Sequence, residues 1–597
     1  MSLLQKYESD PKAVPSAELR AYCAELRAFM LEYLSRTGGH LASNLGVVEL
    51  TVALHRVLDT KRDRLVFDVG HQSYVHKLLT GRLTDFGAGF RSFGGISGFP
   101  KPAESEHDAF ISGHASTSVS VALGMARARA LTGEGYRVAA LIGDGALTGG
   151  LAYEGLSDAG LSGEALVVVL NDNGMSITKN VGAVANLLTR LRLKPGYFGA
   201  KRAYHKVIGA FPPGRHIDKF LAGIKKRVRD AFVPGTFFEQ MGYIYLGPVD
   251  GHDIAKLEFL LRQAFSMRRP VLLHAVTKKG KGYSHAENDP GVYHGVGCFE
   301  VDTGDIKAAT HSFSAVFGEK LLRLAEKDRR ICAVTAAMCG GTGLDGFKAA
   351  YPERFFDVGI AEGHAVTMAS GMAKQGLRPV CAIYSTFLQR AYDNILHDTA
   401  IQNLPVVFAV DRAGLVGEDG ETHQGIFDTH FLGSVPGITL YAPASYAELE
   451  RCLEEALACA GPAAIRYPRG GQGAYDGCGI SPALLSEGGD ATIVTYGIMT
   501  NVALAASDYL RRQGVSVSVV KLTRVVPLDT DAVLPLLSEK VFLLEDNIGV
   551  LPRAIGGTAI NTGCRFIPHG TVEQQLRHCG LDYLSVAKTI LSGIEKA

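Results

Sequence analysis

Short apolar segments that alternate with helical patterns constrain the fold of this 597-residue chain more than any other feature. They are rich in β-branched residues and end at Gly, Asn or Asp; examples are residues 137–142, 165–170, 271–276, 405–410 and 491–496. Strands that are apolar on both faces are typical of parallel sheets covered by helices, so the sequence predicts an α/β fold. Ligand sites of such sheets lie in the loops that leave the carboxyl ends of the strands.

The chain is too long for one hydrophobic core, and we expect it to divide into domains. A polar stretch at 300–310 precedes a new helix at 311–324, and the Gly-rich residues 486–490 open a smaller unit. Each domain is predicted to be a mostly parallel sheet flanked by helices. The predicted domains are 1–307, 308–485 and 486–597.

Composition and charge exclude several classes of function. The formal net charge of +1 gives no reason to expect nucleic acid or an anionic membrane as partner. Segment 186–230 is rich in Lys and Arg, but aromatic residues are not interleaved with the charges, so we favour a solvated connection over a nucleic-acid patch. The ten cysteines include no Cys-x-x-Cys pair, which argues against a zinc site or a disulfide framework. Without a signal segment or a membrane-length apolar run, we expect a cytoplasmic protein.

Two polar turns follow neighbouring predicted strands. Gly143-Asp144-Gly145 closes one strand and Asn171-Asp172-Asn173 closes the next, and the 25 residues between them (146 through 170) leave room for one crossover helix. Asp144 and Asn173 can therefore converge as oxygen ligands of Mg²⁺, with the backbone carbonyl of Met175 beside them. The glycines let backbone N–H groups approach a diphosphate. Either turn alone would be an ordinary βα turn; together they resemble the metal-diphosphate signature of thiamine-diphosphate enzymes.

A glutamate in the second predicted domain meets a further requirement of that cofactor. Thiamine diphosphate needs a carboxylate against its aminopyrimidine ring, and Glu362 comes just after the apolar segment 355–358. A lone glutamate at a helix start is more often solvated. The assignment of Glu362 therefore depends on the two paired turns.

Nearly the whole chain resembles the 1-deoxy-D-xylulose 5-phosphate synthase family. The matching stretches are residues 38–46, 67–72, 112–118, 143–149, 247–252, 277–283, 384–392, 411–417 and 466–470. The resemblance implies two thiamine-diphosphate-binding domains and a smaller transketolase-type C-terminal domain, assembled as a homodimer. It also implies that pyruvate and D-glyceraldehyde 3-phosphate condense with loss of CO₂. This step opens the non-mevalonate isoprenoid route and also supplies thiamine and pyridoxal synthesis.

The same resemblance implies roles for individual residues. His40, His71 and His114 lie in Gly-flanked loops and are placed beside the reactive carbon, where imidazoles can move protons; His423 and Glu362 complete the catalytic set. Contacts to the cofactor are implied for His71, Gly113, His114, Ala115, Asp144, Gly145, Ala146, Asn173, Lys278, Tyr283, Glu362 and Phe387. Contacts to the substrates are implied for Tyr384, Arg390, Arg412, Asp419, His423 and Arg466.

Two of these arginines, Arg412 and Arg466, follow or end apolar strands, and we favour them as phosphate ligands over surface ion pairs because Arg binds phosphate bidentately.

The chain departs from the family pattern at Gly174, Gly363 and Ser157, where Glu, Gln and Asn are usual, and in the compressed interval 548–565. None of these removes a metal ligand, the glutamate or a proposed histidine. The third domain is implied to be remote from the chemistry, so we expect its compression to affect stability or dimer packing before activity. The alternatives are another thiamine-diphosphate enzyme, such as a transketolase or a pyruvate decarboxylase, and a non-catalytic paralogue.

Overall fold

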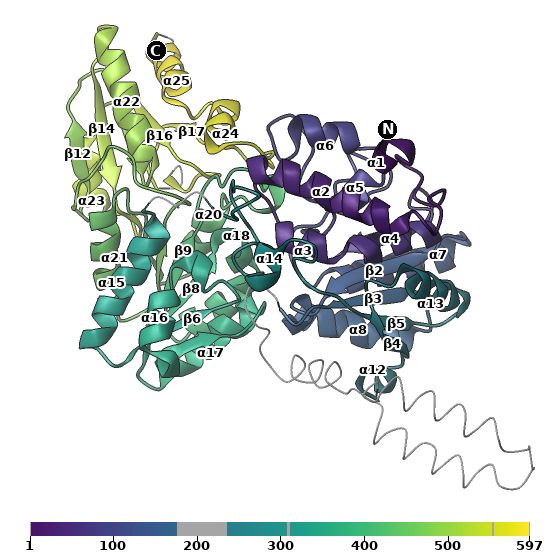
Figure 1. The fold of residues 1–597 in the computed structure, drawn as a ribbon. Helices are drawn as coiled ribbons and strands as arrows, with labels where there is room; N and C mark the ends of the chain where they lie inside the picture. Colours follow the sequence, from purple (N-terminus) through teal and green to yellow (C-terminus); the bar gives the residue numbers. More distant parts are fainter. Residues whose placement is uncertain (1, 176–235, 307–310, 552–553, 596–597) are drawn as a thin grey trace, which may run out of the picture. The chain divides into compact units, whose positions relative to one another are not determined.

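The computed structural model describes residues 2–175, 236–306, 311–551 and 554–595, so the basic segment 186–230 lies outside the described residues. Three mostly parallel sheets, flanked by helices, confirm the predicted α/β fold (Figure 1). By backbone contacts the chain divides into two compact units, residues 1–88 with 98–307 and residues 89–97 with 308–597. The second and third sheets thus belong to one unit.

The first unit contains a five-stranded sheet in which every strand pair is parallel, in the order β1-β2-β3-β5-β4. Its strands are β1 (Arg64–Phe67), β2 (Val138–Gly143), β3 (Val167–Asp172), β4 (Ile244–Asp250) and β5 (Val271–Val276). Its helices are α1 (Leu3–Lys6), α2 (Leu19–Thr37), α3 (Leu41–Gly46), α4 (Val48–Val57), α5 (Tyr74–Leu78), α6 (Leu83–Gly89), α7 (Ser118–Thr132), α8 (Gly150–Ser162), α12 (Thr236–Gln240), α13 (Ile254–Ser266) and α14 (Ser284–Asn288).

The predicted neighbourhood of the two polar turns is confirmed. Strands β2 and β3 are parallel and adjacent, with Gly143 paired to Asn171, and α8 is the crossover helix between them. The strand predicted at 271–276 has those bounds, whereas β2 and β3 begin one and two residues later than predicted. Both turns therefore leave the carboxyl edge of the same sheet, where ligand sites of parallel sheets lie.

The second unit begins with a seven-stranded sheet in the order β15-β10-β11-β9-β8-β6-β7. Its strands are β6 (Ile331–Thr335), β7 (Phe355–Asp357), β8 (Arg378–Tyr384), β9 (Val407–Asp411), β10 (Thr439–Tyr441), β11 (Ala463–Arg466) and the antiparallel edge strand β15 (Arg524–Val526). Its helices are α15 (Phe313–Lys327), α16 (Asp345–Ala350), α17 (Glu362–Lys374), α18 (Ser385–Leu388), α19 (Tyr392–Asn394), α20 (Asp428–Gly433) and α21 (Tyr446–Ala458).

The third sheet is five-stranded, in the order β12-β14-β13-β16-β17, with β12 antiparallel to β14. Its strands are β12 (Ala483–Ser486), β13 (Ala491–Tyr496), β14 (Val517–Leu522), β16 (Val541–Leu544) and β17 (Thr558–Ile560). The helices around it are α22 (Met499–Arg512), α23 (Thr530–Val533), α24 (Val572–Cys579) and α25 (Tyr583–Glu595). Strand β17 falls inside the compressed interval, so the compression keeps this strand of the sheet.

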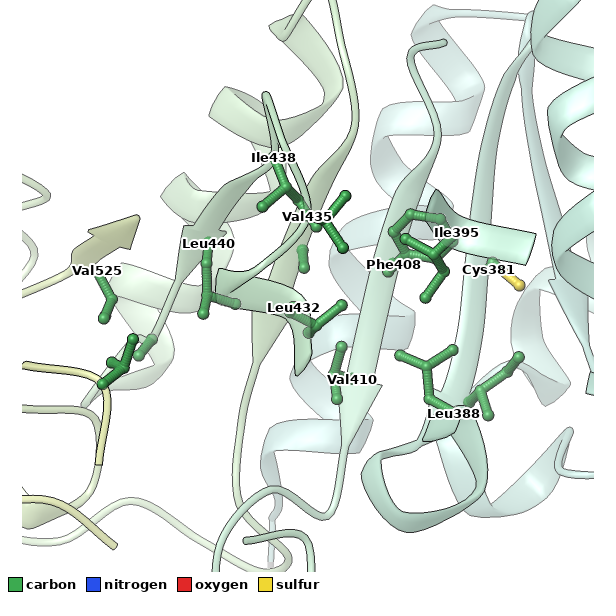
Figure 2. Close-up of a cluster of buried hydrophobic side chains, with 14 of the residues drawn as sticks. Cys381, Leu388, Ile395, Phe408, Val410, Leu432, Val435, Ile438, Leu440 and Val525 are labelled. Atoms are coloured by element: carbon green, nitrogen blue, oxygen red, sulfur yellow. The ribbon is translucent and has the colours of Figure 1, made fainter. Parts of the chain in front are cut away.

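A continuous hydrophobic core joins the second and third sheets. Phe408 and Val410 of β9 pack in one cluster with Leu432 of α20 and Val525 of β15, all buried (Figure 2). Because β15 comes from the third domain yet pairs with β10, the C-terminal part of the chain also closes the edge of the second sheet. The C-terminal domain is therefore built onto the second sheet through apolar burial, which is the main favourable contribution to such packing.

All ten cysteines are free, as their spacing predicted. Among the helices that the structure describes, none has the length and apolar character needed to cross a membrane.

Candidate active site

The two polar turns of the first unit are joined by hydrogen bonds at the edge of the sheet. Oδ2 of Asp144 accepts from the backbone N–H of Gly174 at 2.7 Å, and Oδ1 accepts from Gly145 at 3.1 Å. The backbone N–H of Met175 donates to Oδ1 of Asn173 at 3.1 Å. Gly174 has a φ of +77°, a left-handed conformation that suits glycine, so this departure from the family pattern fits the local backbone. The turns hold Asp144, Asn173 and Met175 close together in the chain's fold, as predicted.

These residues suit a divalent cation held jointly with a diphosphate. They offer one carboxylate, one amide oxygen and a backbone carbonyl, and Mg²⁺ commonly completes its octahedron with water and phosphate oxygens. Within the described ranges no group of three or more His, Cys, Asp or Glu residues could hold a metal ion, so a closed cage of such ligands is absent there. In the same ranges, the buried Nε2 of Gln72 has no hydrogen-bond partner while its Oε1 accepts from Asn171 at 3.1 Å. A buried donor at this edge suits an anionic ligand.

Buried side chains behind the second turn fix its conformation. Nε2 of His274 lies 3.0 Å from Oδ2 of Asp172, and Nδ1 of His274 lies 2.8 Å from the hydroxyl of Tyr245. Both Asp172 and His274 are fully buried. Thr277 donates to Oδ1 of Asn171 at 2.6 Å. Asn171 and Asp172 are thus held by side chains of β5 and of the residue that follows it.

The loop that carries Gly113, His114 and Ala115 lies against the first turn. Oγ of Ser116 donates to the backbone carbonyl of Ala146 at 2.7 Å. The backbone N–H groups of Ser116 and Ser118 donate to the buried carboxylate of Asp68 at 2.7 and 3.0 Å, which fixes the start of α7. His114 is half-buried in this loop, and the predicted residues Gly145 and Ala146 lie in the adjoining turn.

Three histidine rings gather in the first unit, one of which the sequence analysis missed. The rings of His40 and His71 have centroids 5.7 Å apart, and His294 lies 5.6 Å from His40 and 5.3 Å from His71. Burial lowers the pKa of His294 well below its usual value, and the positive charges of Lys279, His71 and His40 act in the same direction. His294 precedes a glycine, whereas His40, His71 and His114 each follow one, so this pattern could not have identified it.

The structure gives no support for the predicted contact of Lys278 with the cofactor. Its side chain is 59% exposed and its Nζ pairs with Glu287 at 2.5 Å. The neighbouring Lys279 is buried instead, and burial lowers its pKa to about 8 against the opposing attraction of Asp144. Adjacent residues of a chain point in different directions, so a pair of lysines does not reveal which one faces the site.

Tyr283 is buried and its hydroxyl donates to the backbone carbonyl of Val301 at 2.9 Å. Its ring lies 6.0 Å from Phe299 and 5.7 Å from Tyr293. The residue is therefore part of an aromatic cluster.

In the second unit, Glu362 is the first residue of α17 and only 4% exposed. Burial raises the pKa of its carboxyl group, opposed by the positive charge of Arg390, whose Nη1 lies 3.9 Å away. A buried carboxyl group with a raised pKa can share a proton with a ring nitrogen. At the next position, a β-carbon on Gly363 would lie 2.8 Å from Oδ1 of Asn394, so the glycine gives this amide room. Ser157, the third departure, is exposed on α8.

Aromatic and cationic groups meet at the carboxyl ends of β8 and β9. The rings of Tyr384 and Phe387 stack at 5.9 Å, and the guanidinium of Arg412 lies 3.9 Å from the Tyr384 ring centre. His423 meets the edge of Phe387 at 5.5 Å. Burial lowers the pKa of His423, with Arg91 and Arg469 acting in the same direction and Asp419 against them. The structure thus brings together the predicted residues Tyr384, Phe387, Arg412 and His423.

Arg412 adopts a left-handed backbone conformation with a φ of +58°, which is uncommon for a residue with a side chain. Its Nη1 donates to the backbone carbonyl of Gly341 and to Oδ1 of Asp411, both at 2.8 Å. Strain of this kind often occurs at functional sites. Asp419, which is also predicted, pairs with Arg91 at 2.6 Å.

The structure buries Arg466, which was predicted to bind the acceptor phosphate, between two carboxylates. Arg466 is only 3% exposed, its Nε contacts Asp428 at 3.1 Å, and its Nη2 lies 3.0 Å from Asp546. Burial opposes the charge of Arg466, but both carboxylates raise its pKa. These two ion pairs hold the guanidinium inside the protein.

Arg469, three residues further along the same segment, is the accessible cation that the sequence analysis missed. Its side chain is 48% exposed, and its Nη1 contacts Glu418 and the backbone carbonyl of Val416, both at 3.0 Å. Arg466 ends the buried strand β11, whereas Arg469 lies in the loop beyond it and precedes a glycine. That difference in position could have indicated from the sequence that Arg469 is the more accessible of the two arginines.

Comparison with known proteins identifies the same architecture. Residues 4–277 match the model of 1-deoxy-D-xylulose-5-phosphate synthase, residues 309–472 that of the transketolase pyrimidine binding domain, and residues 483–548 that of the transketolase C-terminal domain. The 1-deoxy-D-xylulose-5-phosphate synthase of Pelotomaculum thermopropionicum is 46% identical over 619 residues, covering 99% of this chain and 96% of its own. The proteins of that name from Clostridium kluyveri and Carboxydothermus hydrogenoformans are 46% and 47% identical, covering 100% and 96% of this chain.

Proposed function

The chain belongs to the 1-deoxy-D-xylulose 5-phosphate synthase family, and from that premise we propose how its residues divide the work of the reaction. The enzyme is a transferase that condenses pyruvate with D-glyceraldehyde 3-phosphate to give 1-deoxy-D-xylulose 5-phosphate and CO₂. This is the first step of the non-mevalonate isoprenoid pathway, and the product also serves thiamine and pyridoxal synthesis. The observation that carries the proposal is the pairing of Gly143 with Asn171, which sets the two polar turns side by side.

Thiamine diphosphate is the cofactor, and Mg²⁺ is the metal that we propose with it. Asp144, Asn173 and the carbonyl of Met175 hold the metal, while the Nε2 of Gln72 is a donor for the diphosphate. When bound, the cofactor supplies an electron sink for the carbon that loses CO₂. The protein supplies orientation and a fixed electrostatic environment.

Glu362 holds a proton at the pyrimidine end of the cofactor. Its raised pKa keeps the carboxyl group ready to share that proton with a ring nitrogen, and Arg390 limits how far the pKa rises. Phe387, stacked on Tyr384, offers an apolar face to the same ring. The contacts of Gly113, His114, Ala115 and Tyr283 with the cofactor are proposed on the family resemblance.

The cluster of His40, His71 and His294 moves protons near the reacting atoms. Because burial keeps His294 neutral at pH 7, its ring can accept a proton from a hydroxyl group or donate through the other nitrogen. Its Nδ1 lies 3.2 Å from the hydroxyl of Ser43, which orients the ring. We assign His294 to the catalytic set beside the histidines predicted from the sequence.

The acceptor phosphate binds to Arg412 and Arg469. Arg412 lies over the Tyr384 ring, and Arg469 is near enough to lower the pKa of both Tyr384 and His423. Asp419 and His423 contribute contacts to the hydroxyl groups of the acceptor. The two arginines give the forked donors that phosphate recognition favours.

A product assay by NMR with labelled pyruvate tests the reaction. With both substrates and the cofactor, we expect labelled 1-deoxy-D-xylulose 5-phosphate together with CO₂. Release of CO₂ that does not depend on any aldehyde would indicate a pyruvate decarboxylase, and turnover of a ketose donor without CO₂ would indicate a transketolase. No turnover at saturating cofactor would indicate a non-catalytic paralogue.

We further propose that the enzyme is a cytoplasmic homodimer, on the family resemblance. Size-exclusion chromatography with light scattering tests the dimer, because a monomer would have the chain mass of 63.7 kDa.

A further inference from the structure

The C-terminal domain was expected to be remote from the chemistry. It nevertheless contacts the loop that carries the proposed acceptor-binding residues. This loop, residues 411–425, follows β9 and includes Arg412, Asp419 and His423; we call it the acceptor loop. It packs against the segment 566–576, which leads into α24. The loop and the C-terminal domain belong to the same compact unit.

One side chain of α24 binds both backbone groups at the middle of the acceptor loop. Oε1 of Gln575 accepts from the N–H of Gly417 at 3.1 Å, and its Nε2 donates to the carbonyl of Gly417 at 2.8 Å. The same Nε2 donates to the carbonyl of Pro568 at 2.8 Å. Gln575 is fully buried. A buried amide that makes all these bonds fixes the position of the backbone, because breaking them would leave buried polar groups unpaired.

Gly417 is well placed to transmit this constraint. On one side of it, the carbonyl of Val416 accepts from Arg469 at 3.0 Å. On the other side, Glu418 pairs with Arg469 at 3.0 Å, and Asp419 pairs with Arg91 at 2.6 Å. A shift of the backbone at Gly417 would therefore move the partners of Arg469 and Asp419 together.

Two further contacts attach the ends of the acceptor loop to the C-terminal domain. Leu415 and Ile426 form a small buried apolar cluster with Ile567. Near the start of the loop, Gly414 has a φ of +76°, and a β-carbon there would lie 2.2 Å from Oδ2 of Asp546. This carboxylate is also the partner of Arg466. The loop is thus supported at its start, middle and end.

We propose that Gln575 is a positioning residue for the phosphorylated acceptor. It holds Gly417 so that Arg469 and Asp419 are oriented toward the triose phosphate, and it thereby makes the C-terminal domain part of acceptor recognition. This inference rests on the proposed function, because it assigns the acceptor loop to the phosphate of glyceraldehyde 3-phosphate. It predicts that loss of the clamp affects the acceptor and spares the donor.

The test replaces Gln575 by leucine, which has a similar size but cannot form the three hydrogen bonds. In Gln575→Leu we expect the KM for glyceraldehyde 3-phosphate to rise by about tenfold, corresponding to the loss of roughly one charge-assisted hydrogen bond. The KM for pyruvate and the affinity for thiamine diphosphate should stay within about twofold. With D-glyceraldehyde, which lacks the phosphate but keeps the hydroxyl groups that Asp419 contacts, the loss in kcat/KM should be smaller than with glyceraldehyde 3-phosphate.

Val586→Ala is the matched control, since Val586 lies in the core of the C-terminal domain and outside the acceptor loop's contacts. It lowers thermal stability without changing the acceptor KM, which separates positioning from a general loss of stability. If Gln575→Leu does not fold, Gln575→Asn keeps an amide that is one methylene shorter and should give a smaller rise in the acceptor KM.

Hydrogen exchange followed by mass spectrometry gives a readout that does not need turnover. In the substrate-free protein, amides of residues 414–424 should exchange faster in Gln575→Leu than in the wild type or in Val586→Ala. Unchanged exchange, or faster exchange with an unchanged acceptor KM, would overturn the inference. Absence of wild-type turnover would instead refute the proposed function, while the exchange experiment would still measure the clamp.

Discussion

Replacement of Arg466 and replacement of Arg469 should have opposite consequences, although the residues are three positions apart. Arg466→Met removes a buried cation that lies 3.1 Å from Asp428 and 3.0 Å from Asp546, and leaves both buried carboxylates without it. Burial raises the pKa of Asp428 even though the charge of Arg466 opposes the shift, so loss of Arg466 would disfavour the carboxylate further. Arg469→Met instead removes a cation that is 48% exposed.

The expected change in stability depends on how deeply each arginine is buried. Breaking a buried ion pair by removing one partner costs about 3–5 kcal/mol. At roughly 2–4 °C per kcal/mol for a domain of about 150–250 residues, Arg466→Met should lower the unfolding temperature by about 6–20 °C. The exposed pair of Arg469 with Glu418 contributes only about 0–1 kcal/mol, so Arg469→Met should change the unfolding temperature by less than about 4 °C. Its effect should be a rise of roughly tenfold to a hundredfold in the KM for glyceraldehyde 3-phosphate.

Scanning calorimetry and steady-state kinetics on both variants measure these effects. A triple variant, Arg466→Met with Asp428→Asn and Asp546→Asn, removes the uncompensated charges and should regain part of the lost stability. If Arg466→Met leaves the unfolding temperature within about 2 °C of the wild type and raises the acceptor KM, then Arg466 is the phosphate ligand and the structural reasoning is refuted.

Other changes test the cofactor site and the buried polar groups. Glu362→Ala should abolish product formation while metal-dependent diphosphate binding, measured by calorimetry, persists; retained turnover would contradict its role. Lys278→Ala should leave the dissociation constant of thiamine diphosphate within about twofold, because its exposed pair with Glu287 is worth only about 0–1 kcal/mol. Removal of divalent cations by a chelator should abolish binding of thiamine diphosphate, and Mg²⁺ should restore it; binding in the chelated protein would contradict the proposed metal site. Burial lowers the pKa of His55 well below its usual value, so the unfolded state takes up the proton first as the pH falls below about 6.5. The stabilisation that depends on neutral His55 is thus present above that pH, and below it the free energy of unfolding falls by about 1.4 kcal/mol per pH unit. In His55→Gln the free energy of unfolding, measured against pH, should fall less steeply below about pH 6.5 by that amount.

The local pattern of the chain was sufficient to locate the strands and the cofactor turns. Residues 271–276 and 491–496 form strands with the predicted bounds, because an apolar β-branched run is suited to a buried parallel strand whatever its surroundings. The adjacency of the turns at Asp144 and Asn173 followed from chain length, since one crossover helix connects neighbouring strands. Glu362 was located because it comes just after an apolar segment that predicts a strand.

Sequence spacing could not predict the direction in which individual side chains point. Lys278 and Lys279 are adjacent, yet one is exposed and the other is buried near Asp144. Arg466 and Arg469 both belong to a motif that resembles the family, yet the first lies inside the protein. His294 joins His40 and His71 although more than 200 residues separate it from them along the chain.

By itself the sequence determined the α/β class and the positions of the paired turns and of the glutamate that we propose as the cofactor site. These features depend on residue type and on short-range spacing. The tertiary structure alone decided which lysine and which arginine are buried, and it alone connected Gln575 to Gly417. Such contacts join residues far apart in the chain, and they depend on how the sheets pack, which no local pattern encodes.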